Sequence, residues 1–435
     1  MLSSRLPKDL SPSPFFAELE RAKADSAPFI DMTVSSPVKA GLPIDLDAAV
    51  EESRKEFGCW NPDAAGWKSA REAVVEYYRE RGGNFTAGQI LLTASTSEAY
   101  SVLFKTFCDP GDVILTPMPG YPLLDTLAQL EHLECAPYFL KLKRERFDKL
   151  TDLKKVTERR SAPAEVNSFR FALDSDSLLA APEKAKILLL VSPHNPTGHC
   201  VSCEEWNTAV RFCEENNLIL VVDEVFGDYA FTDKVKRTWE YVLGVCHPER
   251  NEVKSKDLWE ADRGDFVNLP ESGPKCPIFW LNGLSKAVGS PQLKLGWMAF
   301  YAPREQFEPI RAALEFVEDA YLSVSASAQA LGTALLKQSA AYESRVKERL
   351  LQNWQTLREV FPSKYCPEVL GGWYAVIRLG EDDEELTLRL LKEKHVLVQP
   401  GFFFDFDEDG WVVISLLQEP ALFKEAVARM TRPSC

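Results

Sequence analysis

Short apolar runs in the middle of the chain alternate with amphipathic stretches of helical length, and this alternation constrains the fold more than any other feature. Residues 187–191 and 218–222 are continuous apolar runs, which is typical of strands buried on both faces. Strand and helix in alternation predict an α/β fold with a mostly parallel sheet covered by helices on both sides. The expected strands cover 89–93, 112–116, 187–192 and 218–223, and the expected helices cover 97–108, 123–133 and 203–217.

The C-terminal part of the chain has a different pattern, with long helical stretches followed by two isolated strands. We therefore predict a large domain over 46–305, and a smaller α+β domain formed by 1–45 together with 306–435. Two polar or charge-rich stretches interrupt the alternation, and we expect them to be surface excursions. The expected C-terminal helices cover 312–336 and 341–360, the strands cover 373–378 and 411–416, and the two excursions cover 141–166 and 241–275.

The composition excludes several classes of partner. The formal net charge of -15 argues against binding to nucleic acid or to an anionic membrane surface. No apolar run approaches the roughly 18 residues that a membrane span needs, and the first residues do not form a secretory signal. The ten cysteines are scattered, as in large intracellular proteins, so we expect a cytoplasmic protein. Cys200 and Cys203 form a lone CxxC without matching histidines, so no metal site is expected.

Residues that directly follow the predicted strands carry the chemistry, because ligands of parallel α/β sheets bind beyond the carboxyl ends of the strands. Ser95, Thr96 and Ser97 open a predicted helix, where free N–H groups favour an anion. Asp223 ends an otherwise apolar strand, and a buried carboxylate needs a cationic partner. Lys286 stands among small residues after an apolar strand and is a candidate to form a Schiff base. The segment 192–198, with the sequence SPHNPTG, is typical of a turn.

Taken in this order, these motifs resemble the class I and II aminotransferases, which are pyridoxal-phosphate enzymes of fold type I. The resemblance runs from about Phe29 to the C-terminus, and it is strongest to a subgroup with the wording LTASTSEAYS, GLSK, PQLKLGW and PGFFFDF. It implies pyridoxal 5'-phosphate as cofactor, small amino and keto compounds as substrates, and a homodimer with the active site at the subunit interface.

The resemblance also implies roles for individual residues. Lys286 would hold the cofactor as a Schiff base and move a proton between the substrate and the cofactor. Asp223 would pair with the pyridine nitrogen and keep it protonated, which makes the ring an electron sink. Asn195 would donate to the cofactor's phenolic oxygen, and Tyr121 would stack on the ring. The expected phosphate ligands are the amides of Ser95 and Thr96, the hydroxyls of Ser97 and Ser285, and Lys294.

Three departures from the family pattern concern the cofactor. Lys294 stands where an arginine usually binds the phosphate, and it would act as a point charge without the bidentate fork. Phe226 replaces the usual tyrosine, so the tuning of the phenolic oxygen is in doubt. Trp60 replaces a tyrosine that usually reaches the phosphate in the neighbouring subunit, and its indole N–H can still donate.

A further departure concerns the substrate. Val413 stands where the family has an arginine that binds the α-carboxylate, and a valine cannot form that pair. Arg378 could substitute, or it could be an ordinary surface or ion-paired arginine. The neighbourhood is unusually aromatic, and Phe402 is a candidate to contact the substrate. A site with fewer fixed cations should discriminate less against amines that lack a carboxylate, or should anchor the carboxylate by other donors.

Three functions remain open at this point. The first is an aminotransferase with atypical recognition of the substrate carboxylate, acting between an amino donor and a keto or aldehyde acceptor. The second is a lyase that eliminates the sulfur group of a cysteine conjugate, because both reactions begin with the same proton removal by Lys286. The third is a cofactor-binding protein without activity, against which the intact Lys286, Asp223 and Asn195 argue.

Overall fold

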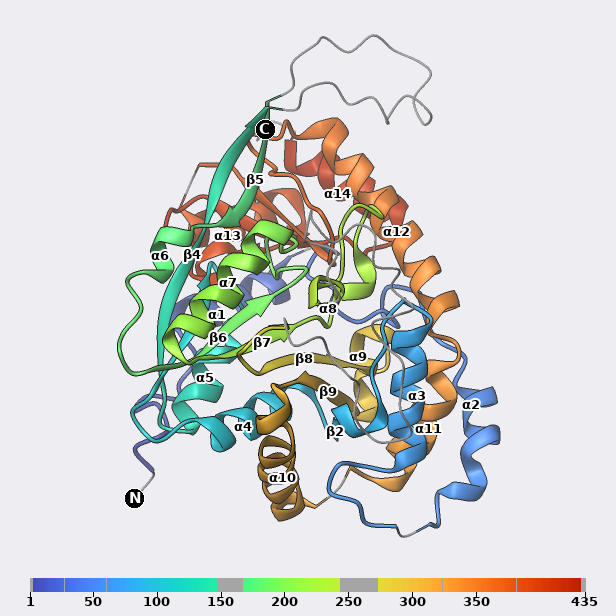
Figure 1. Cartoon of the computed structure of the whole chain (residues 1–435). Helices are drawn as coiled ribbons and strands as arrows, with labels where there is room; N and C mark the ends of the chain where they lie inside the picture. The colour runs from blue at the N-terminus through green and yellow to red at the C-terminus, as the bar shows by residue number, and fades with distance from the viewer. Residues whose placement is uncertain are drawn as a thin grey trace.

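The computed structural model describes residues 3–26, 28–59, 61–146, 167–242, 273–322, 324–380 and 382–431. Its centre is a sheet of eight strands in the order β2-β9-β8-β7-β6-β3-β4-β5 (Figure 1). Strands β2, β8, β7, β6, β3 and β4 run in one direction, whereas β9 and β5 are antiparallel to their neighbours. The strands are β2 (Ile90–Thr93), β3 (Val113–Met118), β4 (Glu134–Arg146), β5 (Asn167–Leu173), β6 (Ala185–Val191), β7 (Ile219–Asp223), β8 (Ile278–Gly283) and β9 (Gly296–Tyr301).

Continuous apolar strands are required here because both faces of the sheet are buried. In β6, Leu188 and Leu190 pack into one core while Ile187 and Leu189 pack into another. In β8, Trp280 packs into the first of these cores and Phe279 into the second. Successive side chains of a strand point to opposite faces, so a strand between two cores can have no polar alternation.

Helices cover both faces, and Figure 1 shows α4 and α10 on one side of the sheet with α7 on the other. The first core contains side chains of α3, α7, α11 and α12, and the second contains side chains of α4, α5 and α10. The bounds are α3 (Lys68–Arg79), α4 (Thr96–Phe107), α5 (Leu123–Leu130), α7 (Cys203–Asn216), α10 (Arg304–Tyr321), α11 (Ala326–Leu336) and α12 (Ser339–Val360). Shorter elements are α2 (Leu46–Ser53), η1 (Arg54–Glu56), η2 (Ala87–Gln89), α6 (Ser175–Leu178), η4 (Gly227–Tyr229), α8 (Thr238–Glu240), α9 (Leu284–Ala287) and η7 (Pro291–Leu293).

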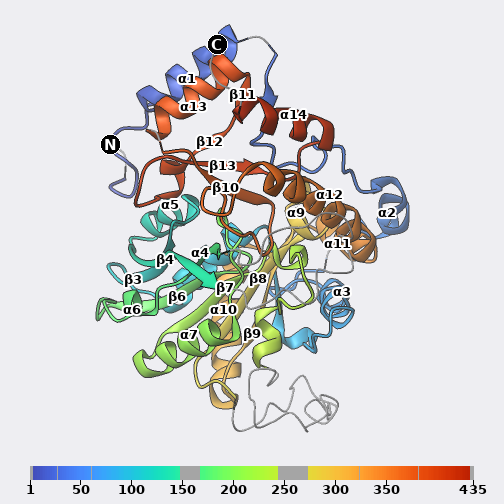
Figure 2. The same ribbon diagram turned by 90° about the horizontal axis from the view of Figure 1, so that it is seen from above.

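The C-terminal part forms a three-stranded antiparallel sheet in the order β10-β13-β12, with helices packed beside it (Figure 2). The N-terminal segment joins this part, because β1 pairs in parallel with β11 and α1 packs against α13. The elements are α1 (Pro14–Asp25), β1 (Ile30–Asp31), β10 (Tyr374–Arg378), α13 (Asp383–Lys394), β11 (Val396–Leu397), β12 (Gln399–Pro400), η8 (Gly401–Phe404), β13 (Trp411–Ser415) and α14 (Pro420–Thr431).

The predicted fold class is confirmed: the protein is an α/β protein with a large, mostly parallel sheet. The predicted single helical stretch over 312–336 is wrong, because the chain turns at Leu322 with φ +67° and α11 begins after the N-cap Ser325. The predicted excursion 141–166 is wrong in its first six residues, which extend β4 and pair with β5. The rest of it lies outside the described residues, as does most of 241–275. The domain division at residues 46 and 305 stays a prediction.

No helix among the described residues is long and apolar enough to cross a membrane. The same residues contain no group of three or more histidine, cysteine or acidic side chains that could hold a metal ion.

Candidate active site

The carboxylate of Asp223 lies at the end of β7, on the edge of the sheet where the parallel strands finish. Its Oδ2 accepts a hydrogen bond of 2.7 Å from the Tyr100 hydroxyl, and its Oδ1 accepts one of 3.0 Å from the amide of Val225. Burial raises the pKa of Asp223, although these two donors and the charge of Lys286 oppose that rise. No lysine, arginine or histidine among the described residues forms an ion pair with this carboxylate, so the cationic partner expected from the sequence is not a side chain of this part of the chain.

Lys286 follows the neighbouring strand β8 in the short helix α9. Its Nζ lies 4.5 Å from the centre of the Trp373 ring and 5.2 Å from that of Phe226. Burial lowers the pKa of Lys286 to about 8, and the charge of Asp223 only partly opposes this. The Tyr229 hydroxyl donates to the Lys286 carbonyl over 2.6 Å, which fixes the backbone below the amine.

Two glycines allow the start of β9 to lie close to the end of β8 and to the segment after β2. Gly283 and Gly296 are register partners in β8 and β9. A Cβ on Gly296 would lie 3.0 Å from the Ser95 carbonyl carbon and 3.1 Å from the Thr96 nitrogen, which is closer than ordinary packing. Ser95 caps α4 by accepting from the Glu98 amide over 3.2 Å. The start of α4, where the sequence predicts a phosphate, is therefore held directly against β9.

Asn195 lies in the loop after β6, with its Oδ1 buried and without a hydrogen-bond partner among the described residues. The loop is closed by the His194 amide, which donates to the His199 carbonyl over 2.7 Å, and by the Gly198 amide, which donates to the His194 carbonyl over 2.8 Å. A buried amide oxygen without a partner is costly, and as an acceptor it needs a hydrogen-bond donor that the described residues do not supply.

Tyr121 lies after β3 at the open side of this group and is 47% exposed. Partial burial raises the pKa of its phenol, and the nearby charge of Asp223 adds to this effect. The Gly120 amide donates to the Phe404 carbonyl over 2.8 Å, so the loop of Tyr121 is fixed to the C-terminal part of the chain.

The remaining predicted cofactor residues occupy different surroundings. Ser97 and Ser285 are half-buried at the starts of α4 and α9. Lys294 is exposed, and its backbone takes the left-handed conformation with φ +54°. Trp60 lies outside the described residues. Phe226 is buried, and its ring centre lies 5.4 Å from that of Trp373 and 6.0 Å from that of Tyr374.

The predicted substrate residues lie on the three-stranded sheet and beside it. Val413 is fully buried in β13 opposite Val376. Arg378, at the far end of β10, forms an ion pair with Glu408, and its guanidinium lies 5.7 Å from the Trp411 ring centre. The structure therefore gives Arg378 an acidic partner outside the group around Lys286.

Phe402 contacts the N-terminal helix, with its ring centre 5.3 Å from that of Phe15 in α1. Its ring lies 4.7 Å from Phe403, and its amide donates to Asp383 over 2.7 Å. These contacts place it in an aromatic cluster between η8 and α1.

Sequence reasoning gave no role to Tyr100 and Trp373. Tyr100 belongs to the quoted motif LTASTSEAYS, where it stands one helical turn after Thr96 and so on the same helix face. Trp373 follows the glycine pair 371–372, a signal for a close backbone approach that draws attention to the next side chain.

The arrangement defines a class of protein. Among the described residues, a half-buried lysine, a half-buried carboxylate without a side-chain ion pair, an unpartnered asparagine oxygen and a capped helix start lie at one edge of a mostly parallel sheet. These features fit a flat, cationic ring that carries an anionic arm, because the carboxylate can pair with the ring and a helix start favours an anion. They are the features of a pyridoxal-phosphate enzyme of fold type I.

The comparisons give the family. The model of the aminotransferase class I and II family matches residues 46–430, so the chain belongs to this family. Enzymes of this family use pyridoxal phosphate, and this protein is an enzyme of that kind.

Similar proteins are distant in sequence. The chain is 24% identical over 383 residues to the glutamate-pyruvate aminotransferase AlaA of Haemophilus influenzae, covering 85% of this chain and 81% of the relative. It is 22% identical over 401 residues to a probable aminotransferase, TAT1, of Arabidopsis thaliana, covering 88% and 76%. The structure resembles that of an alanine aminotransferase from Pyrococcus furiosus with a TM-score of 0.73, at 19% identity, covering 99% of this chain and 98% of the other.

Proposed function

We propose that the protein transfers an amino group between an amino donor and a keto or aldehyde acceptor, and that it recognises the substrate without the usual carboxylate-binding arginine. The observation that carries the proposal is that Asp223 and Lys286 follow neighbouring strands and lie near enough for each charge to affect the pKa of the other, while burial lowers the pKa of Lys286 to about 8. Bound pyridoxal phosphate supplies an aldehyde and an electron-withdrawing ring. The chain's own residues then have to hold that ring and move one proton.

Asp223 is suited to hold the ring nitrogen in its charged form. Its two oxygens already accept from Tyr100 and Val225, so the carboxylate is fixed in orientation. An anion held beside a ring nitrogen raises the pKa of that nitrogen. Tyr100 would therefore act as a positioning residue, because it holds Oδ2 of the carboxylate that would pair with the ring.

Lys286 is suited to carry the proton. A base is most effective when its pKa lies near the working pH, and burial brings the amine from 10.5 to about 8. The rings of Trp373 and Phe226 exclude water from one side of the amine. Tyr229 holds the lysine backbone, so the amine moves on a fixed stem.

The proposal of atypical carboxylate recognition rests on the geometry of β10 and β13. Val413 lies on the same strand face as Trp411, whose ring centre lies 5.7 Å from Phe171 of the large sheet. Val413 therefore faces the large sheet and presents an apolar side chain there. Arg378 lies four residues beyond Tyr374, about 13 Å along the strand. We propose that donors other than Arg378 anchor a short substrate.

We also propose a homodimer, as the resemblance implies, and a cytoplasmic location, which the scattered cysteines favour. Three large apolar side chains at the end of α10 and just beyond it are exposed, and a partner subunit would cover them: Phe316, Tyr321 and Leu322. Light scattering of the holoenzyme at micromolar concentration tests the assembly, and an active monomer would count against it.

The test of the reaction is a screen of amino donors against purified holoenzyme. Conversion of the cofactor to its pyridoxamine form, followed by its return on adding a keto acid, supports amino transfer. Ammonia and pyruvate released from a cysteine S-conjugate without any keto acceptor would instead identify a lyase. Borohydride reduction should attach the cofactor to Lys286, and a peptide map that finds the label elsewhere would remove the basis of the proposal.

A further inference from the structure

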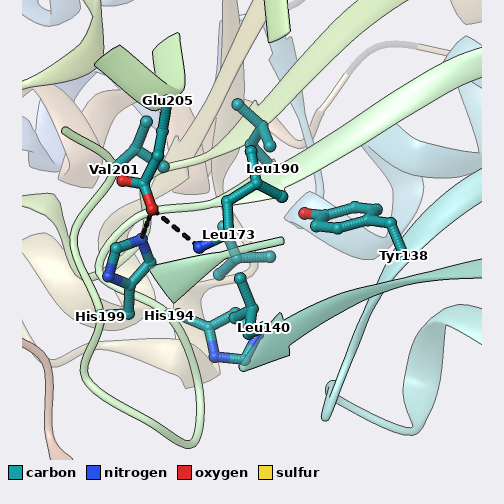
Figure 3. Close-up of a pocket in the computed structure, with 9 residues that line it drawn as sticks. Tyr138, Leu140, Leu173, Leu190, His194, His199, Val201 and Glu205 are labelled. Carbon is teal, nitrogen blue, oxygen red and sulfur yellow. Dashed lines mark hydrogen bonds and ion pairs between the residues drawn. The ribbon is translucent and has the colours of Figure 1, made fainter. Parts of the chain in front are cut away.

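A buried polar cluster lies directly behind the loop that carries Asn195. It lines a cavity of about 10 Å³ together with Tyr138, Leu140 and Leu173, and its polar members are His194, His199 and Glu205 (Figure 3). Such a volume accommodates about one water molecule and no substrate. The cluster therefore cannot be a ligand site, and its polar groups need another explanation.

Glu205 is a rigid anchor inside this cluster. Its Oε1 accepts from the Leu173 amide at the end of β5 over 2.7 Å, and its Oε2 accepts from the Ser202 amide over 2.8 Å. The second bond belongs to the capping box of α7, in which the Ser202 hydroxyl accepts from the Glu205 amide. These donors and the neighbouring His199 hold the pKa of Glu205 well below its usual range, so the group is a charged carboxylate fixed to two elements.

His199 connects the loop to that anchor. Its Nε2 lies 3.2 Å from Oε1 of Glu205, an ion-pair contact without hydrogen-bond geometry, which a dashed line marks in Figure 3. Its carbonyl accepts the amide of His194, the residue immediately before Asn195. Its amide donates to the Thr197 hydroxyl over 3.3 Å, and that hydroxyl lies 2.9 Å from Nδ1 of His194. The residues on both sides of Asn195 are thus tied to His199.

The same loop also contacts the segment that leads to Trp373, whose ring lies beside the amine of Lys286. The Gly198 carbonyl accepts from the amides of Leu370 and Gly371 over 2.9 and 3.2 Å, just before Trp373. A Cβ on Gly198 would lie 2.5 Å from Val369 Cγ1, so the loop and this segment are closely packed. A shift of the loop would therefore displace Asn195 directly, and Trp373 through the packed segment that precedes it.

We propose that the buried His199–Glu205 pair is the positioning element for Asn195, fastening its loop to β5 and α7 so that its amide is held towards the cofactor. The inference rests on the proposed function, because it assigns Asn195 a contact with the cofactor. In this role His199 acts only through Asn195. Its side chain is turned to Glu205 and away from the reacting atoms.

The test is a double-mutant cycle between His199→Ala and Asn195→Ala. His199→Ala should shift the pH midpoint of the lysine-bound cofactor's absorption band in the same direction as Asn195→Ala. It should also lower kcat/KM about tenfold, which corresponds to about 1.4 kcal/mol. In the Asn195→Ala background the same change should leave the absorption midpoint in place and alter kcat/KM by no more than about twofold, since residues acting as one unit are not additive.

Three further variants separate positioning from simple stability. His199→Gln keeps an N–H that can reach Glu205 and should stay within about threefold of the wild type in kcat/KM. His199→Leu keeps the volume and loses the contact, so it should reproduce His199→Ala even if the alanine variant does not fold. Tyr241→Phe removes the 3.1 Å bond from Tyr241 to the Val201 carbonyl, two residues away, and should leave the absorption midpoint unchanged.

Two outcomes would overturn the inference. Additive effects in the cycle would show that His199 acts independently of Asn195. A loss of thermal stability in His199→Leu with an unchanged absorption midpoint would reduce the pair to a structural contact. Borohydride labelling of Lys286 in the wild type keeps the two proposals apart. Failure of labelling removes the proposed function, whereas normal labelling with an additive cycle removes only the positioning role.

Discussion

The amine of Lys286 should react with aldehydes at a pH where ordinary lysines do not. Burial lowers its pKa from 10.5 to about 8, a change that corresponds to about 3 kcal/mol. The ring faces of Trp373 and Phe226 attract the ammonium form, but such contacts contribute only about 0.5–2 kcal/mol. Loss of hydration therefore outweighs the attraction, and the neutral amine is favoured.

The expected size of the effect follows from the two pKa values. At pH 7 an amine with a pKa of about 8 is roughly 10% neutral, whereas an ordinary lysine is about 0.03% neutral, a difference of about 300-fold. Only the neutral amine attacks an aldehyde. Because the folded pKa is lowered, the neutral fraction of Lys286 rises between about pH 7 and 9 and is nearly complete above that range.

The assay is stopped-flow absorbance after mixing apoenzyme with pyridoxal phosphate from pH 6 to 10. The rate constant for covalent attachment should rise with pH, with a midpoint near 8, and then level off. Nα-acetyl-lysine, whose side-chain amine is free, corrects under the same conditions for titration of the aldehyde itself. Trp373→Ala should admit water and move the midpoint upwards. A midpoint near that of Nα-acetyl-lysine in the wild type would refute the reasoning, since burial would then have no effect on the amine.

Three other outcomes are expected. Asp223→Asn should retain cofactor but lose several orders of magnitude in kcat, measured on the best donor of the screen, because a neutral amide cannot hold the ring nitrogen's proton; near-normal turnover would contradict this. Gly296→Ala should weaken cofactor binding and destabilise the fold by about 1–3 kcal/mol in thermal unfolding, because its Cβ would lie too close to the start of α4. Gly58→Ala is the control and should be neutral, since a Cβ there has nothing within 4 Å. Val413→Arg should not raise kcat/KM and should lower the Tm, because the side chain is fully buried; a tenfold gain would show that the missing arginine is a defect.

The sheet could be predicted because its strands are buried on both faces, which leaves an unmistakable apolar run such as 187–191. The extension of β4 could not, because Lys141, Lys143 and Arg144 carry charge on a two-stranded arm and look like a loop. The break at Leu322 was missed for another reason. Apolar periodicity continues across it, and a leucine with positive φ gives no local signal.

The site shows the same division. Asp223, Lys286 and Asn195 could be found because topology alone brings the ends of parallel strands to one edge. Whether they act as the resemblance implies stays a prediction. Tyr100 could not be found in this way, because it reaches Asp223 from a helix face and depends on how α4 packs against the sheet.

Whether Arg378 can bind a substrate carboxylate depends more on its distance from Lys286 than on its ion pair with Glu408. Its ion pair with Glu408 joins half-exposed side chains, and such pairs contribute about 0–1 kcal/mol, so a substrate carboxylate could displace Glu408. Arg378 lies about 13 Å along β10 from Tyr374, and no substrate can change that separation. Tyr374 contacts Phe226, which lies beside Lys286. We therefore expect a short amino acid held at Lys286 to leave Arg378 unused. A substrate that does use it must carry an anionic or carbonyl group far from its amine, so a donor screen that includes both short and long compounds separates the two cases.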